Sequence, residues 1–310
     1  MAKKIVFMGT PMFAVPILKS LYQNGFPISV VYTQPPKKSN RGQKIRKSPI
    51  QGIAETLNID FRSPESLKDN KEEYNFLKDL GADLAIVVAY GQIIPKNFLN
   101  LTKKGFINIH GSILPRWRGA APIQRSIMNL ENETGISIMK ITEELDSGPV
   151  SNIYKMKLEK NDNAEEISEK LSNLAAEKIL DNIDDIFEDK AKFIDQDHSK
   201  ATYAKKIEKL EGEINWSDEP LKNLGKINGL FPTPGAFFIF DGERYKILKA
   251  EIGNGLGKVG EVISDKLEIA CGNSQSIKIL EIQRQGKKSQ KIGEFMLGSK
   301  IKKGTVLLNV

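Results

Sequence analysis

Short apolar segments alternate with amphipathic ones through the first 190 residues, and this alternation constrains the fold more than any other feature. Strands that alternate with helices favour a mainly parallel sheet wound by helices. The expected strands are residues 4–8, 28–32, 83–89, 105–110, 135–141 and 150–158. The expected helices are residues 13–22, 120–128, 163–187 and one that begins at Ser48-Pro49, where serine suits the N-cap and proline the first helical position.

The character of the sequence changes after about residue 190. Residues 190–207 are polar and weakly periodic, which is typical of a linker. Beyond them, short strands between Gly- and Asp-containing turns predict a small β-barrel. These strands are residues 236–240, 245–250, 260–264, 267–270, 277–283 and 306–308. A chain of 310 residues fits two domains, and we place them at 1–189 and 208–310.

The single cysteine, Cys271, excludes a disulfide framework within one chain and a cysteine cluster for zinc. We therefore expect no metal. Lys3 and Lys4 precede an apolar stretch, but Gly9-Thr10-Pro11 interrupts it, so a strand and a turn explain it better than a signal peptide. We find no apolar run of about 18 residues, the length that crosses a membrane. We expect a cytoplasmic protein without a membrane partner, and a monomer.

Positive charge is concentrated near the N-terminus. The net charge is +7, no Asp or Glu precedes Glu55, and residues 159–189 are acidic. An exposed loop is expected after Thr33-Gln34-Pro35-Pro36, and it holds the cations Lys37, Lys38, Arg41, Lys44, Arg46 and Lys47. Such an uneven field favours an anionic partner. The alternative, lysines that only keep the surface soluble, stays open on charge alone.

Two polar side chains share one face of an expected strand. In Ile107-Asn108-Ile109-His110-Gly111, residues two apart point the same way, so Asn108 and His110 project together. The strand ends at Gly111, and ligands of wound sheets bind at the carboxyl ends of strands. The strand that ends in Ala89-Tyr90-Gly91 opens onto the same crevice. The other histidine, His198, lies in the expected linker and suits a solvated surface position.

Asp146, in a turn between two expected strands, is the third polar candidate. Taken alone it is an ordinary turn residue, just as His110 taken alone is a hydrogen-bonded core histidine. Together the three side chains suit acyl transfer to an amine. A neutral imidazole can accept the amine proton, a carboxylate can orient the imidazole, and an amide can donate to the developing oxyanion. The sequence around them offers no Ser or Cys nucleophile, so direct attack by the amine is the simplest route.

These residues lie within longer motifs that resemble the methionyl-tRNA formyltransferase family. The central motif is His110-Gly111-Ser112-Ile113-Leu114-Pro115-Arg116-Trp117-Arg118-Gly119-Ala120-Ala121-Pro122-Ile123-Gln124-Arg125. Shorter ones are Met8-Gly9-Thr10-Pro11, Thr33-Gln34-Pro35, Val88-Ala89-Tyr90-Gly91, Leu145-Asp146-Ser147-Gly148, Ala201-Thr202-Tyr203-Ala204 and Ile214-Asn215-Trp216-Ser217. The resemblance covers essentially the whole chain.

The resemblance implies a Rossmann-like formyltransferase domain with a mainly parallel sheet (1–189), a linker (190–207) and a small OB-like, tRNA-binding β-barrel domain (208–310). It implies Asn108, His110 and Asp146 as the catalytic trio and 10-formyltetrahydrofolate as donor. The folate-binding residues would be Ser112, Ile113 (where leucine is usual), Leu114 and Pro115, with Ala89, Tyr90 and Gly91. Initiator methionyl-tRNA would bind Lys37, Lys38, Arg41, Gly42, Lys44, Arg46 and Lys47. Lys287, Lys288 and Lys291 offer a second basic patch, or a solvated surface.

Three alternatives remain at this point. A folate-dependent formyltransferase for a small amine, such as a sugar nucleotide or a ribotide, would use the same trio. A non-catalytic tRNA-binding protein would need neither the trio nor a folate site. A dinucleotide-dependent dehydrogenase would need a G-x-G-x-x-G turn, which Gly9-Thr10-Pro11 is not.

Overall fold

The computed structural model describes residues 3–39 and 44–307 of the protein. Contacts between residues divide the chain into two compact units that interleave along the sequence. The first consists of residues 1–119, 135–156 and 168–203, and the second of residues 120–134, 157–167 and 204–310. The second unit therefore includes two segments that precede residue 190.

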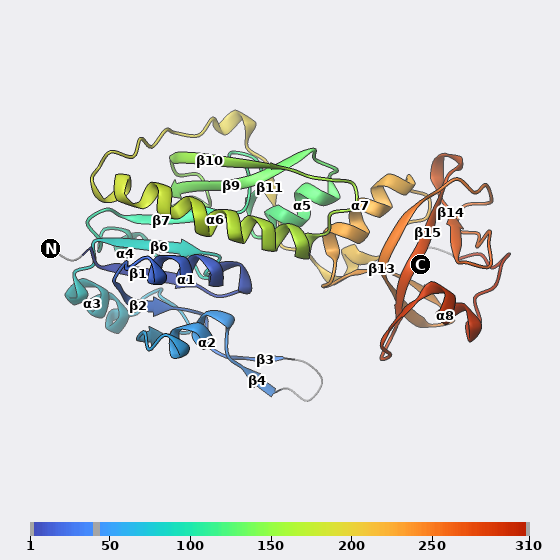
Figure 1. Ribbon diagram of the computed structural model, residues 1–310, viewed down its shortest axis with the longest axis horizontal. Coiled ribbons are helices and arrows are strands. Elements are labelled where there is room, and N and C mark those ends of the chain that lie inside the picture. Colours follow the sequence, from blue (N-terminus) through green and yellow to red (C-terminus); the bar gives the residue numbers. More distant parts are fainter. Residues whose placement is uncertain (1–2, 40–43, 308–310) are drawn as a thin grey trace. The chain divides into compact units, whose positions relative to one another are not determined.

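A seven-stranded sheet forms the centre of the first unit (Figure 1). Its strands are β1 (Ile5–Gly9), β2 (Ile28–Tyr32), β5 (Phe61–Arg62), β6 (Leu84–Val88), β7 (Phe106–His110), β9 (Glu133–Lys140) and β10 (Val150–Lys157). They lie in the order β10-β9-β7-β6-β1-β2-β5. The neighbours from β5 to β7 are parallel, whereas β9 pairs with β7 antiparallel. The predicted mainly parallel α/β sheet is confirmed.

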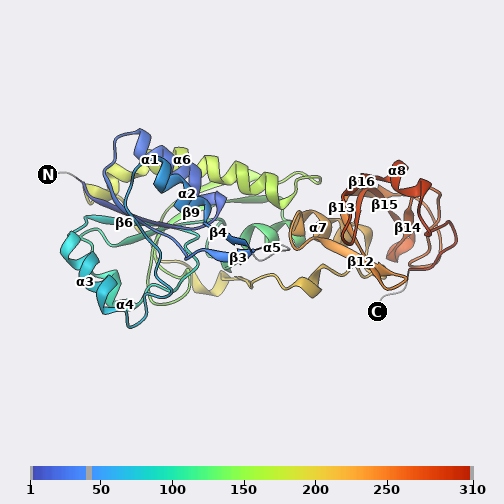
Figure 2. The same ribbon diagram turned by 90° about the horizontal axis from the view of Figure 1, so that it is seen from below.

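Helices cover both faces of this sheet (Figure 2). The helices α1 (Val15–Gln23) and α6 (Ala164–Phe187) lie together on one face, where the Ser20 hydroxyl donates to the Ala176 carbonyl at 2.8 Å. The helices α3 (Lys71–Leu80) and α4 (Lys96–Leu99) lie on the other, where Leu77 and Phe98 belong to the same buried cluster as Val6 of β1. With both faces covered, β1 and β6 are buried along their whole length, as parallel strands usually are.

The helix expected from Ser48-Pro49 is α2 (Pro49–Thr56). The Ser48 hydroxyl accepts from the Gln51 backbone N–H, so the N-cap inferred from sequence is confirmed. A short 3-10 helix (Met12–Ala14) precedes α1.

The basic segment after Pro36 was expected to be a loop, and this was wrong. It is an antiparallel hairpin of β3 (Lys37–Ser39) and β4 (Lys44–Arg46). Backbone pairing between the strands satisfies the peptide groups of this charged segment. Residues 40–43, including Arg41 and Gly42, lie outside the described residues.

The expected linker packs along the first unit for much of its length. Ile194 exchanges two backbone hydrogen bonds with Val150, and a 3-10 helix (His198–Lys200) follows. Further along, the backbone N–H of Arg118, in the short strand β8 (Arg118–Gly119), donates to the Thr202 carbonyl at 2.8 Å. The strand β11 (Tyr203–Ala204) completes this stretch.

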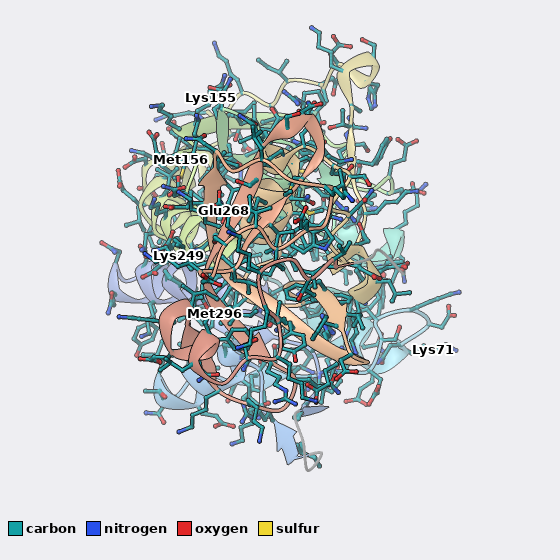
Figure 3. All side chains as sticks on the ribbon, turned by 90° about the vertical axis from the view of Figure 1, so that its right-hand side faces the viewer. Lys71, Lys155, Met156, Lys249, Glu268 and Met296 are labelled. Carbon is teal, nitrogen blue, oxygen red and sulfur yellow. The ribbon has the colours of Figure 1, made fainter. Side chains whose placement is uncertain are left out.

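The second unit is built on an antiparallel sheet. Its strands are β12 (Ala236–Phe240), β13 (Glu243–Gly253), β14 (Glu268–Ala270), β15 (Ser276–Arg284) and β16 (Ser289–Lys291). Its helices are α5 (Pro122–Met128), α7 (Pro220–Leu230), α8 (Ile292–Leu297) and the 3-10 segments Lys209–Gly212 and Gly272–Ser274. Figure 3 shows side chains of this unit, with Lys249 of β13, Glu268 of β14 and Met296 of α8 labelled.

An aromatic core closes the second unit, where Phe238 and Tyr245 stack at a centroid distance of 5.4 Å beside the buried Trp216. The strands expected at 260–264 and 306–308 are reduced to isolated bridges, Glu261 to Val306 and Val262 to Ile269. A pairing of single residues does not extend into a ladder. Residue 308 lies outside the described part of the chain.

Candidate active site

The end of β7 carries the first two polar groups. Phe106, Asn108 and His110 point to one face of the sheet by the period of two, and Phe106 packs in the cluster that contains α3 and α4. Asn108 is half-buried, and His110 is 6% exposed. The strand therefore aims an amide and an imidazole out of the same face, at its carboxyl end.

Asp146 reaches these groups from the turn between β9 and β10. Its backbone is left-handed, with φ at 47°. One carboxylate oxygen, Oδ2, accepts from the Gly119 backbone N–H at 2.8 Å and lies 3.6 Å from His110 Nδ1. The other, Oδ1, accepts from the Asn108 amide at 3.4 Å. The structure thus brings together the three side chains that the sequence singled out.

The contacts of His110 indicate its tautomer. Nε2 lies 2.9 Å from the Trp117 carbonyl oxygen, which can only accept, so Nε2 carries the proton of the neutral ring. Nδ1 then holds the lone pair, and 3.6 Å from the Asp146 carboxylate is too long for a hydrogen bond. A proton that arrives on Nδ1 forms an imidazolium flanked by two acceptors, and the carboxylate stabilises it electrostatically.

Hydrogen bonds from β9 hold the backbone of the segment 112–115. The Ser137 hydroxyl donates to the Ser112 carbonyl at 2.7 Å and accepts from the Leu114 backbone N–H at 3.1 Å. The Ser112 hydroxyl donates to the Arg116 carbonyl, and Leu114 packs in a small buried cluster with Met139 and Val150. The partly exposed side chains of this segment are Ile113 and Pro115.

The turn after β6 offers main-chain groups. Ala89 and Gly91 are exposed and have φ values of 47° and 78°. A side chain at position 91 would be strained by the φ of 78°, and its Cβ would also displace the amide of Gln34. The Tyr90 ring, only 2% exposed, packs in the core, where burial raises the pKa of its hydroxyl. A ligand at this turn would therefore contact backbone rather than the tyrosine ring.

Two residues that support the Asp146 turn, Arg118 and Gln196, were not predicted from the sequence. The Gln196 amide contacts the backbone of the Asp146 turn, and the Arg118 guanidinium contacts Gln196. The signals that could have found them are indirect. Arg118 stands within the central motif, whereas Gln196 lies in a segment whose polar composition resembles a linker.

The cations of the hairpin differ in their surroundings. The Lys37 ammonium contacts the Gln34 side chain, Arg46 is exposed, and the Lys47 ammonium lies 2.9 Å from both Glu55 carboxylate oxygens. Lys47 lowers the pKa of the Glu55 carboxyl. Lys38 and Lys44 are placed by their backbone, while Arg41 and Gly42 fall in the undescribed tip.

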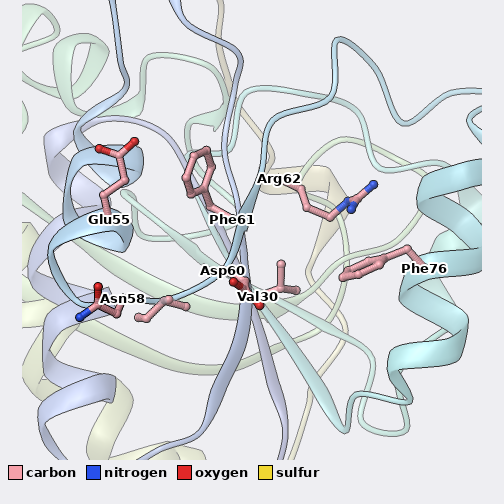
Figure 4. A pocket seen from close by; sticks show the side chains of 8 residues that line it. Val30, Glu55, Asn58, Asp60, Phe61, Arg62 and Phe76 are labelled. Carbon is pink, nitrogen blue, oxygen red and sulfur yellow. The ribbon is translucent and has the colours of Figure 1, made fainter.

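A cavity of about 570 Å³ lies away from this site, beside β5 at the edge of the sheet (Figure 4). Its lining includes Phe61, Arg62 and Phe76, with the Arg62 guanidinium stacked 4.3 Å from the Phe76 ring centroid. A second cavity of about 500 Å³ in the second unit is lined in part by Arg284, Lys287 and Lys288. Neither cavity is lined by His110.

Two general features bear on the class of protein. Within residues 3–39 and 44–307, no group of three or more His, Cys, Asp or Glu side chains is placed to hold a metal ion. No helix in the described part of the chain has the length and apolar character needed to cross a membrane.

Comparison with known proteins identifies the family. The profile "Formyl transferase" matches residues 3–183, and "Formyl transferase, C-terminal domain" matches residues 206–300. A methionyl-tRNA formyltransferase of Pelagibacter ubique (strain HTCC1062) is 69% identical over 310 residues, which is 100% of both chains. That of Jannaschia sp. (strain CCS1) is 41% identical over 305 residues, 98% of this chain and 99% of the relative.

The fold has counterparts among solved structures. The sugar 3N-formyl transferase WlaRD, crystallised in the presence of dTDP and 5-N-formyl-THF, superposes with a TM-score of 0.70 at 20% identity, over 93% of this chain and 100% of that one. That likeness shows the fold alone, whereas the full-length sequence identities show the family. The chain belongs to the formyl transferases and, within them, to the methionyl-tRNA formyltransferase family.

Proposed function

We propose that this protein transfers the formyl group of 10-formyltetrahydrofolate to the α-amino group of methionyl-initiator tRNA. The observation that carries the proposal is the 69% identity with a methionyl-tRNA formyltransferase over the full length of both chains. The acid–base geometry at the end of β7 supports it, because a non-catalytic tRNA-binding protein has no use for such a constellation.

Asn108, His110 and Asp146 are proposed as the catalytic residues. The methionyl amine attacks the formyl carbon, and the Asn108 amide donates a hydrogen bond to the oxygen as it becomes negative. His110 Nδ1 accepts the amine proton, and Asp146 stabilises the imidazolium. The bond between the formyl carbon and folate nitrogen breaks, and the proton passes from His110 to that nitrogen. Formyl-methionyl-tRNA and tetrahydrofolate are the products.

The donor is proposed to lie between two backbone segments. A pterin is a flat heterocycle with donors and acceptors on its edge, and the exposed main chain of Ala89 and Gly91 can match that edge. The partly exposed Ile113 and Pro115 side chains can cover the apolar part. Tyr90, Ser112 and Leu114, whose side chains are engaged within the protein, would act by shaping these segments.

The acceptor tRNA is proposed to meet the basic hairpin. Lys37, Arg46 and Lys47, with Lys38 and Lys44, would position phosphates, and the pair Arg41-Gly42 would contact the acceptor end. In this proposal residues 1–189 are the catalytic domain, 190–207 the linker and 208–310 a tRNA-binding domain. The protein would act as a monomer in the cytoplasm.

The test is formyl transfer with charged initiator and elongator methionyl-tRNA side by side. We expect rapid formylation of the initiator species alone. Transfer to sugar-nucleotide or ribotide amines, in preference to charged tRNA, would overturn the proposal. That alternative is not favoured, because the sugar formyltransferase WlaRD shares only 20% identity with this chain.

A further inference from the structure

We propose that Gln196, supported by Arg118, is the positioning residue that holds Asp146 against His110; this role rests on the proposed function. The Gln196 side chain is 7% exposed. Its amide nitrogen donates to two backbone carbonyls of the turn between β9 and β10, that of Asp146 at 2.9 Å and that of Gly148 at 2.7 Å. One buried amide thus grips the turn on both sides of residue 147.

Arg118 fixes the other end of this amide. Its guanidinium donates twice to the Gln196 carbonyl oxygen, from Nε at 3.1 Å and from Nη2 at 2.8 Å. Arg118 is 2% exposed, and two of its nitrogens also lie 3.4 Å from His198 Nδ1. Because the Arg118 guanidinium donates to the Gln196 carbonyl oxygen, the Gln196 amide cannot flip, and its NH₂ group must face the turn.

The backbone of the turn is closely constrained. Asp146 is left-handed, with φ at 47°, a conformation that aspartate tolerates better than most non-glycine residues. A Cβ at Gly148 would collide with the Lys140 carbonyl, so the strands approach closely there. If the turn relaxed, the two hydrogen bonds from Gln196 would be lost and the carboxylate would leave Gly119 N–H and His110. Gln196 touches the backbone of Asp146 and no reacting atom, so it acts through that residue.

The segment that contains Gln196 also supports Trp117, whose carbonyl accepts from His110. The Trp117 backbone N–H donates to the Thr202 hydroxyl at 2.9 Å, and the Trp117 carbonyl accepts from His110 Nε2 at 2.9 Å. Residues 196–202 therefore support both acceptors that flank the imidazole, one through Gln196 and the other through Thr202. A segment with the composition of a linker thereby sets the geometry of the acid–base pair.

The chemical requirement is specific, which makes the proposal testable. Only a side chain that donates twice and also accepts can serve both Arg118 and the turn. Gln196→Glu keeps the acceptor for Arg118 but cannot donate to the carbonyls, and Gln196→Ala removes both functions without adding charge. The matched control is Asp195→Asn, which alters an exposed neighbour by the same exchange of carboxylate and amide.

Kinetics on the full-length enzyme give the first readout. We expect Gln196→Glu and Gln196→Ala to lower kcat by about 10- to 100-fold with KM for donor and tRNA near the parent values, because a misplaced group slows chemistry without weakening binding. Asp195→Asn should behave like the parent. In an Asp146→Asn background, Gln196→Ala should cost little further activity, since the two residues act as one unit.

A spectroscopic readout is independent of turnover. The chain has only two histidines, so ¹⁵N-histidine labelling gives two sets of ring signals, and His198→Gln assigns them. Both Gln196 variants should shift the His110 ring nitrogens, and Asp195→Asn should not. Unchanged His110 signals, a loss confined to KM, or losses that add in the double variant would each overturn the positioning role. A parent enzyme that fails to formylate tRNA would instead refute the proposed function, and the ring signals would still test the positioning role.

Discussion

His110 lies between a carbonyl and a carboxylate, and this decides which of its nitrogens would accept the proton in the proposed reaction. The Trp117 carbonyl oxygen accepts from His110 Nε2 at 2.9 Å, so the lone pair of the neutral ring is on Nδ1, toward Asp146. His110→Ala removes the proposed base while leaving the basic hairpin intact. We expect kcat for formyl transfer to fall by about 10²- to 10⁴-fold, with tRNA affinity near the parent value. Single-turnover formylation and a filter-binding assay measure the two; a large loss of affinity would mean that the ring is structural.

Asn108 is expected to act on the oxygen rather than on the proton. One amide N–H faces Asp146 Oδ1 at 3.4 Å, which leaves the other for the carbonyl oxygen of the donor. Asn108→Ala should therefore lower kcat by about 10²-fold or more and leave the folate Kd little changed. Isothermal titration with a folate and steady-state kinetics provide the comparison. Unchanged kcat would remove Asn108 from the mechanism.

Residues within one strand were predictable, and residues that meet across the fold were not. The period of two places Asn108 and His110 on one face from sequence alone. Their meeting with Asp146 came only from the family resemblance. Gln196 lies 50 residues beyond Asp146 and 78 beyond Arg118, with no local pattern to connect them. Such contacts depend on the order of the strands in the sheet, and this order cannot be derived from local sequence patterns.

At the scale of an element, α2 was predictable because its start is encoded locally. Ser48 accepts from Gln51 N–H at 2.9 Å and exchanges a 2.7 Å hydrogen bond with the Thr33 hydroxyl. Ser48→Ala should lower the free energy of unfolding by about 1 kcal/mol. Urea denaturation measures this, with Ser48→Asp as a control that retains the cap. Equal stability of the alanine variant and the parent would contradict the role of the cap.

The β3–β4 hairpin was not predictable, because its charged residues lack the alternation of a half-buried strand. Its cations should not contribute equally. Lys47 is engaged by Glu55, whereas Arg46 is exposed. Arg46→Ala should reduce the slope of log affinity for tRNA against log salt by nearly one, and Lys47→Ala should reduce it less, because Glu55 already neutralises that charge. Binding isotherms from low to moderate salt measure both slopes. Equal slopes for the two variants would contradict this ranking.

At the scale of the molecule, periodicity reveals elements but not which elements pack together. The helix expected at 120–128 is present as α5, yet it packs on α7 of the second unit, where Gly225 and Gly229 allow close approach to Met128. About a hundred residues separate these helices in the sequence. Helix α7 was not predicted from the sequence, because Gly225 and Gly229 interrupt its helical pattern.

Stability at alkaline pH should report on the core of the second unit through its only thiol. Cys271 is 2% exposed, and burial raises the pKa of its thiol from 9.0 to about 11. Because the thiol pKa is higher in the folded state, burial of the neutral thiol contributes to the free energy of unfolding. That contribution is complete below pH 9 and is lost as the pH rises through 11. Two pKa units correspond to at most about 3 kcal/mol.

Cys271→Ala isolates this contribution, because buried tyrosines such as Tyr32, whose pKa burial also raises, remain in both proteins. The variant should be less stable than the parent at pH 7, since a small cavity replaces the sulfur. Between pH 9 and 11 it should lose less stability than the parent, so the two curves converge. Free energies of unfolding from urea titrations at pH 7, 9, 10 and 11 provide the measurement. Parallel curves would contradict this prediction. They would mean that the thiol has the same pKa in the folded and unfolded states, because water reaches it before the unit unfolds.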